Sequence, residues 1–111
     1  MIVKKENEAT VIEVESATLT AANSKEFKAA LEPYLDTEMN IVINLSNVTF
    51  LDSSGLGIFL FCLKKLNQKG GDVKLCNVTK PVRVLFELVR LHQIIEVFNT
   101  EEEALASFTQ K

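Results

Sequence analysis

The amino-acid sequence predicts an α/β fold, with a mostly parallel sheet of about five strands that about four helices cover. Short β-branched segments alternate with longer segments of helical periodicity in the order β-β-α-β-α-β-α-β-α. Such alternation is typical of parallel β-α-β units. The chain has 111 residues, of which 47% are hydrophobic. This is enough for the core of a single domain that spans residues 1–111.

Five segments have the short length and the β-branched composition of strands. They cover residues 2–5, 9–15, 41–45, 73–77 and 94–98. The third segment is an almost continuous apolar run, which is typical of a strand covered on both faces. A polar turn at residues 6–8, rather than a helix, joins the first two strands. We therefore expect the first strand to pair antiparallel at an edge of the sheet.

Four segments have the periodicity or the start signals of helices. They cover residues 23–35, 54–68, 81–91 and the stretch that follows Thr100. Asn23 or Ser24 can cap the first of these helices. Pro33 is expected to bend or end it, because proline lacks a backbone N–H and its ring clashes with the preceding turn. Gly70-Gly71 is expected to stop the second helix.

The last two helices carry their own start signals. Pro81 suits a first helical turn, where a backbone N–H has no partner. Thr100 can cap the final helix, and the carboxylates of residues 101–103 suit the positive end of its dipole. Large apolar side chains of the second and third helices are expected in the core. They are Phe59, Leu60, Phe61, Leu63, Leu66, Phe86, Leu88 and Leu91.

Composition and charge exclude several classes of protein. The net charge is −3, the pI is about 5.2 and no run of Lys or Arg exceeds two residues, which argues against nucleic-acid binding. The longest apolar stretch, residues 58–63, is too short to span a membrane. Residues 1–5 do not resemble a signal peptide. We therefore expect a cytoplasmic protein that binds neither nucleic acid nor membrane.

Metal and cofactor sites are not expected. Cys62 and Cys76 are predicted to be free, buried thiols in a reducing compartment. His92 is the single histidine of the sequence, which is too few for a metal site, and it is expected to be solvated near a helix end. The sequence contains neither a P-loop nor a dinucleotide-binding fingerprint. We predict no metal and no cofactor.

The junction before the second helix reads Asp52-Ser53-Ser54-Gly55-Leu56-Gly57. Functional sites of open α/β sheets gather beyond the carboxyl ends of strands, and Asp52 or Ser53 can cap the helix. Gly55 and Gly57 each cost about 1 kcal/mol relative to alanine in a helix. They also leave the first turn free of side chains, so that another molecule can approach the backbone. The junction is therefore predicted to contact a partner.

Ser53 places a hydroxyl at the N-terminus of that helix. Phosphorylation would add about −1.5 to −2 charges at pH 7. Free N–H groups and the helix dipole would tolerate this charge, so the fold is expected to survive. A partner that rests on the glycine turn would be repelled unless it offered a cation. The residue can therefore act as a switch without large refolding.

The run from Leu51 to Gly57 resembles the signature of the anti-sigma-factor antagonists within the STAS domain family. The resemblance extends over nearly the whole chain, and it implies a STAS fold with Ser53 as the phosphorylated residue. It further implies a partner that is both an anti-sigma factor and a serine kinase of the GHKL ATP-binding type. A serine phosphatase would reverse the modification. The unmodified protein would bind the kinase and so release a sigma factor for transcription.

The resemblance also implies a partner-binding surface made by the junction and by the loop ahead of the first helix. Its residues are Asp52, Ser53, Ser54, Gly55, Leu56, Gly57, Thr20, Ala21 and Asn23. Family members usually carry Gly-x-(Leu/Ile)-Asp in that loop, where this chain has Ala17-Thr18-Leu19-Thr20. The departure leaves the fold unaffected and bears on which partner is recognised and how tightly.

Two other functions were weighed against this one. Ser53 is not expected to be a nucleophile, because its surroundings do not match Gly-x-Ser-x-Gly and His92 has no identified orienting acid. We therefore predict no enzymatic activity. The alternative is a STAS scaffold of a signalling assembly, or a module that binds a small ligand or a nucleotide.

Overall fold

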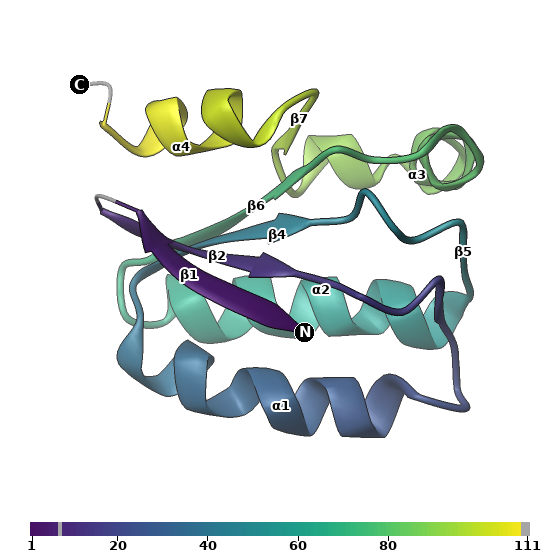
Figure 1. Ribbon diagram of the computed structural model, residues 1–111, viewed down its shortest axis with the longest axis horizontal. Coiled ribbons are helices and arrows are strands. Elements are labelled where there is room, and N and C mark those ends of the chain that lie inside the picture. The colour runs from purple at the N-terminus through teal and green to yellow at the C-terminus, as the bar shows by residue number, and fades with distance from the viewer. Residues whose placement is uncertain (7, 110–111) are drawn as a thin grey trace.

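A five-stranded sheet runs through the centre of the molecule, with strand order β1-β2-β4-β6-β7 (Figure 1). Its strands are β1 Ile2–Glu6, β2 Ala9–Glu13, β4 Asn40–Asn44, β6 Asp72–Cys76 and β7 Val97–Phe98. β1 pairs antiparallel with β2, and every other pairing in this sheet is parallel. This computed structural model describes residues 1–6 and 8–109, so Asn7 of the predicted turn lies outside the described residues. The α/β prediction and its antiparallel edge strand are confirmed.

Four helices cover the two faces of the sheet. They are α1 Ser24–Thr37, α2 Ser53–Asn67, α3 Lys80–Val89 and α4 Glu101–Thr109. Figure 1 shows α1 and α2 side by side on one face and α4 on the other. α3 packs on the same core cluster as α2, where the rings of Phe59 and Phe86 meet edge to face with their centroids 6.1 Å apart. The alternation of the sequence thus produces a three-layer arrangement.

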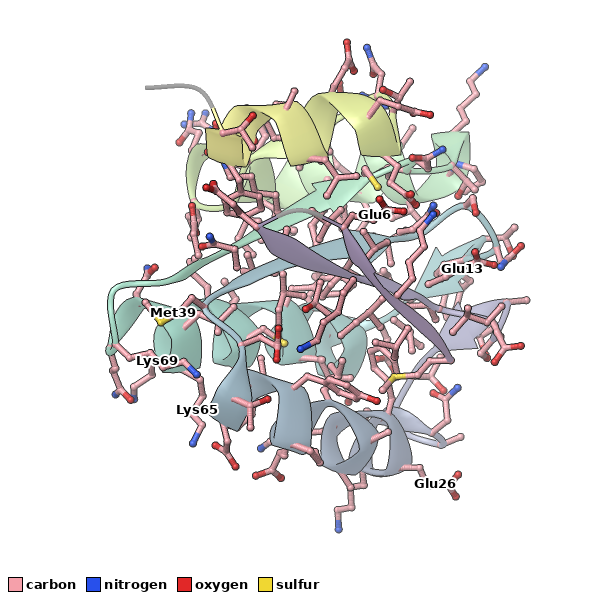
Figure 2. The ribbon with its side chains drawn as sticks, turned by 60° about the vertical axis from the view of Figure 1, so that its left-hand side comes forward. Glu6, Glu13, Glu26, Met39, Lys65 and Lys69 are labelled. Atoms are coloured by element: carbon pink, nitrogen blue, oxygen red, sulfur yellow. The ribbon has the colours of Figure 1, made fainter. Side chains whose placement is uncertain are left out.

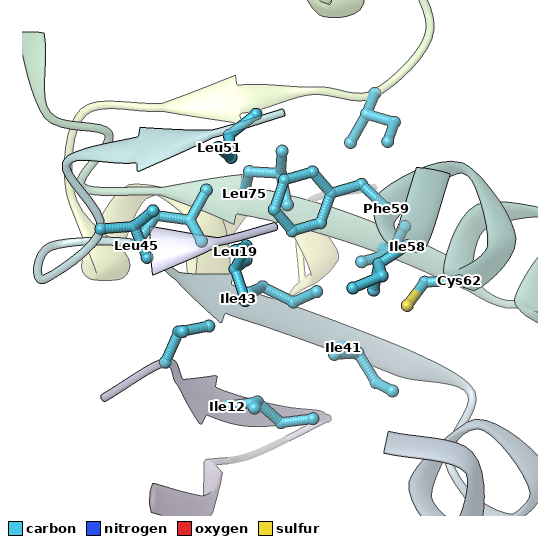
Figure 3. Packing of buried hydrophobic residues seen from close by; sticks show 14 of the residues in the cluster. Ile12, Leu19, Ile41, Ile43, Leu45, Leu51, Ile58, Phe59, Cys62 and Leu75 are labelled. Atoms are coloured by element: carbon cyan, nitrogen blue, oxygen red, sulfur yellow. The ribbon is translucent and has the colours of Figure 1, made fainter. Parts of the chain in front are cut away.

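A second, two-stranded sheet was not predicted. β3 (Thr18–Leu19) pairs in parallel with β5 (Phe50–Leu51), and β5 leads directly into α2. Leu19 and Leu51 point inward, and Figure 3 shows both among core side chains from α2 and the central strands. Strands of two residues are too short to display a period in the sequence. This small sheet joins the segment before α1 to the segment before α2.

The central strand β4 has the burial expected of a strand covered on both faces. Ile41 and Ile43 are buried in the large cluster beneath α1, α2 and α3. Val42 is buried in a smaller cluster with Cys76 and Ala104, beneath α4. The alternation follows the two-residue period of strands. It explains why the whole run is apolar.

Both cysteines are free and buried, as predicted. Burial raises the pKa of the Cys62 thiol to about 12. Burial also raises the pKa of the Cys76 thiol to about 12, and the nearby carboxylates of Glu101 and Glu102 act in the same direction. Because the thiolate is the reactive form, both side chains act as small apolar core residues at neutral pH.

Several predicted boundaries were wrong. α1 continues through Pro33 to Thr37; Pro33 is exposed, so water can solvate the carbonyl that loses its N–H partner. The predicted strand at 94–98 is reduced to Val97–Phe98, because the 3-10 helix at Leu91–Gln93 is followed by a turn and a bend at residues 94–95. The second predicted strand ends at Glu13 rather than residue 15.

Two side chains predicted in the core lie at the surface. Leu88 is 76% exposed and Leu60 is 42% exposed. α2 is apolar on nearly every side, so a pattern alone does not reveal that Leu60 lies on the outer side. The predicted cap of the last helix is confirmed, because Thr100 Oγ1 accepts a hydrogen bond from the backbone N–H of Glu103 at 3.1 Å.

Glycine is required at positions 70 and 55 for two different geometric reasons. Gly70 follows the end of α2 with a φ of +85°, a conformation that favours glycine. Gly55 is buried in the first turn of α2, and a Cβ there would lie 2.5 Å from the backbone oxygen of Leu19. Gly55 therefore allows α2 to approach β3 closely. A Cβ on Gly57 would meet no atom within 4 Å.

Gly55→Ala and Gly57→Ala are expected to change stability in opposite directions. Alanine gains up to about 1 kcal/mol over glycine in a helix, but overpacking against a backbone atom costs about 1–3 kcal/mol. We expect Gly55→Ala to lower the free energy of unfolding by up to about 2 kcal/mol. Gly57→Ala is expected to raise it by up to about 1 kcal/mol. Urea unfolding followed by circular dichroism measures both, and equal effects would contradict the close-approach argument.

Candidate functional site

The candidate site lies at the start of α2, where β5 ends. Ser53 is the first residue of the helix and its side chain is exposed. Figure 1 shows that α1 begins at the same end of the molecule. The site therefore combines the beginnings of two neighbouring helices with the loop that precedes α1.

Asp52 caps α2 and ties it to the loop before α1. Its Oδ1 accepts hydrogen bonds from the backbone N–H groups of Ser54 at 2.8 Å and Gly55 at 3.2 Å. Its Oδ2 accepts one from the backbone N–H of Ala21 at 3.2 Å. The backbone N–H of Asp52 donates to the carbonyl oxygen of Leu19 at 3.2 Å. One side chain thus holds together two segments 31 residues apart.

The ionised form of Asp52 is favoured by these contacts. Partial burial of the carboxyl group opposes ionisation. The hydrogen bonds from the backbone N–H groups of Ala21, Gly55 and Ser54 outweigh it, so the pKa of Asp52 lies below the usual aspartate value. The carboxylate is negatively charged at neutral pH, and the three N–H groups occupy its oxygens.

The loop over residues 20–23 is held by its own side chains. Asn23 accepts a hydrogen bond from the backbone N–H of Thr20 at 2.9 Å and donates one to the carbonyl oxygen of Thr18 at 2.8 Å. Asn23 is the N-cap residue of α1, one of the two predicted positions, but its side chain makes no cap hydrogen bond and bonds within the loop instead. The hydroxyl of Thr20 accepts a hydrogen bond from the backbone N–H of Ala22 at 3.2 Å.

The structure brings the predicted partner-binding residues to one end of the molecule. The junction and the loop meet through the Asp52–Ala21 hydrogen bond and the β3–β5 pairing. Gly55 is an exception in its role, because the backbone that it allows to approach is the chain's own Leu19 rather than a partner. Gly57 is exposed and has open space in front of it, as the prediction required.

Sequence reasoning missed a groove of about 330 Å³ between α1 and α2, beside the junction. Its lining residues are Ser24, Lys25, Lys28, Ser54, Gly57, Ile58 and Phe61. The helical spacing of Lys25 and Lys28 is visible in the sequence and predicts that they share a face. The sequence does not show that this face lies beside the first turns of α2, because that follows from how the helices pack.

The candidate metal ligands are scattered over the described residues. Among them, no group of three or more His, Cys, Asp or Glu side chains is arranged to hold a metal ion. His92 lies exposed in the 3-10 helix at Leu91–Gln93. Across residues 1–6 and 8–109, no helix combines the length and the apolar character needed to cross a bilayer.

Asp52→Asn is expected to change how stability depends on pH. Because the folded pKa of Asp52 is lowered, its carboxylate stabilises the fold at pH values above about 4, and this contribution is lost as the pH falls through the lowered pKa. Thermal unfolding of the wild type and Asp52→Asn is the measurement. The difference in Tm is expected to be largest near neutral pH and to shrink in acid. A constant difference would contradict this, and Glu32→Gln at an exposed position of α1 is the control.

Comparison with known proteins identifies relatives among bacterial regulators. The STAS domain family matches residues 1–104 of this chain. An anti-sigma F factor antagonist of Paenibacillus polymyxa is 42% identical over 66 residues, which are 60% of this chain and 56% of that protein. An anti-sigma-B factor antagonist of Listeria monocytogenes is 35% identical over 86 residues, which are 77% of this chain and 75% of that protein.

Solved structures share the fold. An anti-sigma factor antagonist from Mycobacterium paratuberculosis superposes with a TM-score of 0.87 at 23% identity, over 98% of this chain and 92% of that one. The unphosphorylated form of the anti-sigma factor antagonist SpoIIAA superposes with a TM-score of 0.79 at 24% identity, over 97% of this chain and 95% of that one. With the family match over residues 1–104, the chain belongs to the STAS domain family.

Proposed function

We propose that this chain is an anti-sigma factor antagonist, and that phosphorylation of Ser53 controls its binding to an anti-sigma factor. The unmodified protein binds an anti-sigma factor that is also a serine kinase of the GHKL type. Binding releases a sigma factor and so permits transcription. Two relatives that match 60% and 77% of this chain carry the name anti-sigma factor antagonist, and this supports the proposal.

The observation that carries the proposal is the position of Ser53. Its hydroxyl is exposed on the first residue of α2, while the side chain of the preceding Asp52 accepts hydrogen bonds from the backbone N–H groups of the following Ser54 and Gly55. A kinase can therefore reach the hydroxyl without unfolding the helix. A serine phosphatase can reach the phosphate in the same way, which makes the modification reversible.

The hydrogen bonds of Asp52 also determine what a phosphate on Ser53 would do. The sequence predicts that free N–H groups at the helix start would tolerate the charge of a phosphate, but Asp52 already occupies those of Ser54 and Gly55. The phosphate would therefore remain solvated at the surface, beside an existing carboxylate. The fold can tolerate it there, and a partner that covers the site would meet its full charge. We propose that this exchange takes place in the cytoplasm, where an ATP-dependent kinase has its substrate.

The first test is phosphorylation of the purified protein by the GHKL-type kinases of its own organism. With ATP, we expect one kinase to add a single phosphate, which mass spectrometry of peptides assigns to Ser53. Ser53→Ala is expected to abolish the modification, and the neighbouring Ser54→Ala to retain it. No phosphorylation of the folded wild-type protein by any of these kinases would contradict the proposal and favour the scaffold or ligand-binding alternative.

The second test is binding to that kinase. Because a negative charge at Ser53 would face the covered surface, Ser53→Asp is expected to stay folded and to raise the Kd at least about tenfold, while Ser53→Ala keeps the wild-type Kd. Thr109→Asp adds the same charge at the end of α4 and serves as the control. If Ser53→Asp still binds, protein with phosphoserine at position 53 shows whether aspartate is a poor mimic of phosphate or the switch is wrong. Tight binding of the phosphorylated protein would disprove the switch.

A further inference from the structure

The groove between α1 and α2 opens beside the proposed phosphorylation site. Ser54, the chain neighbour of Ser53, lines one side of it, and Ser24 at the start of α1 lines the other. Gly57 contributes no side chain, and a Cβ at this position would meet no atom within 4 Å. Ile58 and Phe61 form an apolar floor farther along α2. The groove of about 330 Å³ is large enough for a few side chains of another molecule.

The charge of this groove differs from that of the whole chain. The net charge of the protein is −3, yet Lys25 and Lys28 both line the groove, and none of its described lining residues is acidic. The acid of the same helical turn, Glu26, lines a different recess with Glu15. Within the first turn of α1, the two signs thus lie on different sides of the helix. The side that adjoins the junction is the basic one.

Lys28 is held in place within the groove. Its Nζ lies 4.0 Å from the centre of the Phe61 ring, within the range of a cation–π contact. Phe61 is part-buried in α2, so its ring packs against the core and still supports the ammonium group. A lysine held by a ring loses less side-chain entropy when it pairs with an incoming carboxylate.

We propose that this basic groove receives an acidic segment of the kinase, whose carboxylates pair with Lys25 and Lys28. This inference rests on the proposed function and names the chemistry of the partner surface. The positive side chains, the open space at Gly57 and the apolar floor match a segment that carries carboxylates next to an apolar residue. Charge complementarity of this kind steers association and selects the correct partner.

The groove also gives the phosphate a second way to act. Ser53 directly precedes the lining residue Ser54, so a phosphate on Ser53 would lie at the edge of the groove. Charges interact over roughly 10 Å at moderate salt. Its charge would oppose the positive field of Lys25 and Lys28. An acidic segment would then lose its attraction to the groove as well as meeting the phosphate itself.

The test is a set of charge variants, measured for binding to the kinase that phosphorylates Ser53. Lys25→Glu and Lys28→Glu are each expected to raise the Kd about tenfold or more, because each places a like charge against the acidic segment. Lys69→Glu makes the same charge change far from the groove and serves as the control. Figure 2 shows Lys69 at the other end of the helix pair from Glu26, which lies in the first turn of α1. This variant is expected to leave the Kd within about twofold of wild type.

Controls separate the possible failures. Circular dichroism and thermal unfolding check that each variant is folded, and Lys28→Arg keeps the charge and is expected to keep binding. Raising the salt concentration is expected to weaken binding of the wild type more than binding of Lys28→Glu. If folded Lys25→Glu and Lys28→Glu kept the wild-type Kd while Ser53→Asp lost binding, the groove inference would be overturned and the proposed function would stand. If no GHKL-type kinase bound the wild type, the proposed function and this inference would both fall.

Discussion

The close approach of α2 to β3 is the constraint on which the rest of the site depends. The missing side chain of Gly55 lets the first turn of the helix lie against the carbonyl oxygen of Leu19. At this separation the carboxylate of Asp52, which caps its own helix, also reaches the backbone N–H of Ala21. The loop before α1 is thereby fixed next to Ser53. A chain lacking this contact could form the central sheet and still not assemble the surface.

A rigid site of this kind favours a switch that acts through charge. Asp52 uses its oxygens on three backbone N–H groups, and these groups are then no longer available to neutralise a phosphate on the next residue. The usual affinity of a helix start for anions is therefore already taken up within the protein. A phosphate on Ser53 would change the surface that a partner meets and leave the fold as it is. The structural support of the site and its response to modification thus arise from the same carboxylate.

The sequence predicts much of this fold because its strands and helices have clear periods. The apolar run at β4 and the capping residues of the last helix are local signals, and the structure confirms both. The small β3–β5 sheet was missed because two-residue strands show no period. The role of Gly55 was misread because the atom that requires a glycine, the carbonyl oxygen of Leu19, lies 36 residues earlier in the chain. The role of Lys25 and Lys28 in the groove could not be predicted, because it depends on how α1 and α2 pack against each other.

The departure of this chain at Thr20 bears on the charge of the surface. The family resemblance implies an acid at position 20. There the hydroxyl of Thr20 accepts a hydrogen bond from the backbone N–H of Ala22, so the loop keeps its turn without a carboxylate. The side of the site that faces α2 is thus left with Lys25 and Lys28 as the charged lining of its groove. An acid at position 20 would offset part of that positive charge. If the groove binds an acidic segment of the kinase, as proposed, the missing acid at position 20 and the basic groove both favour that binding.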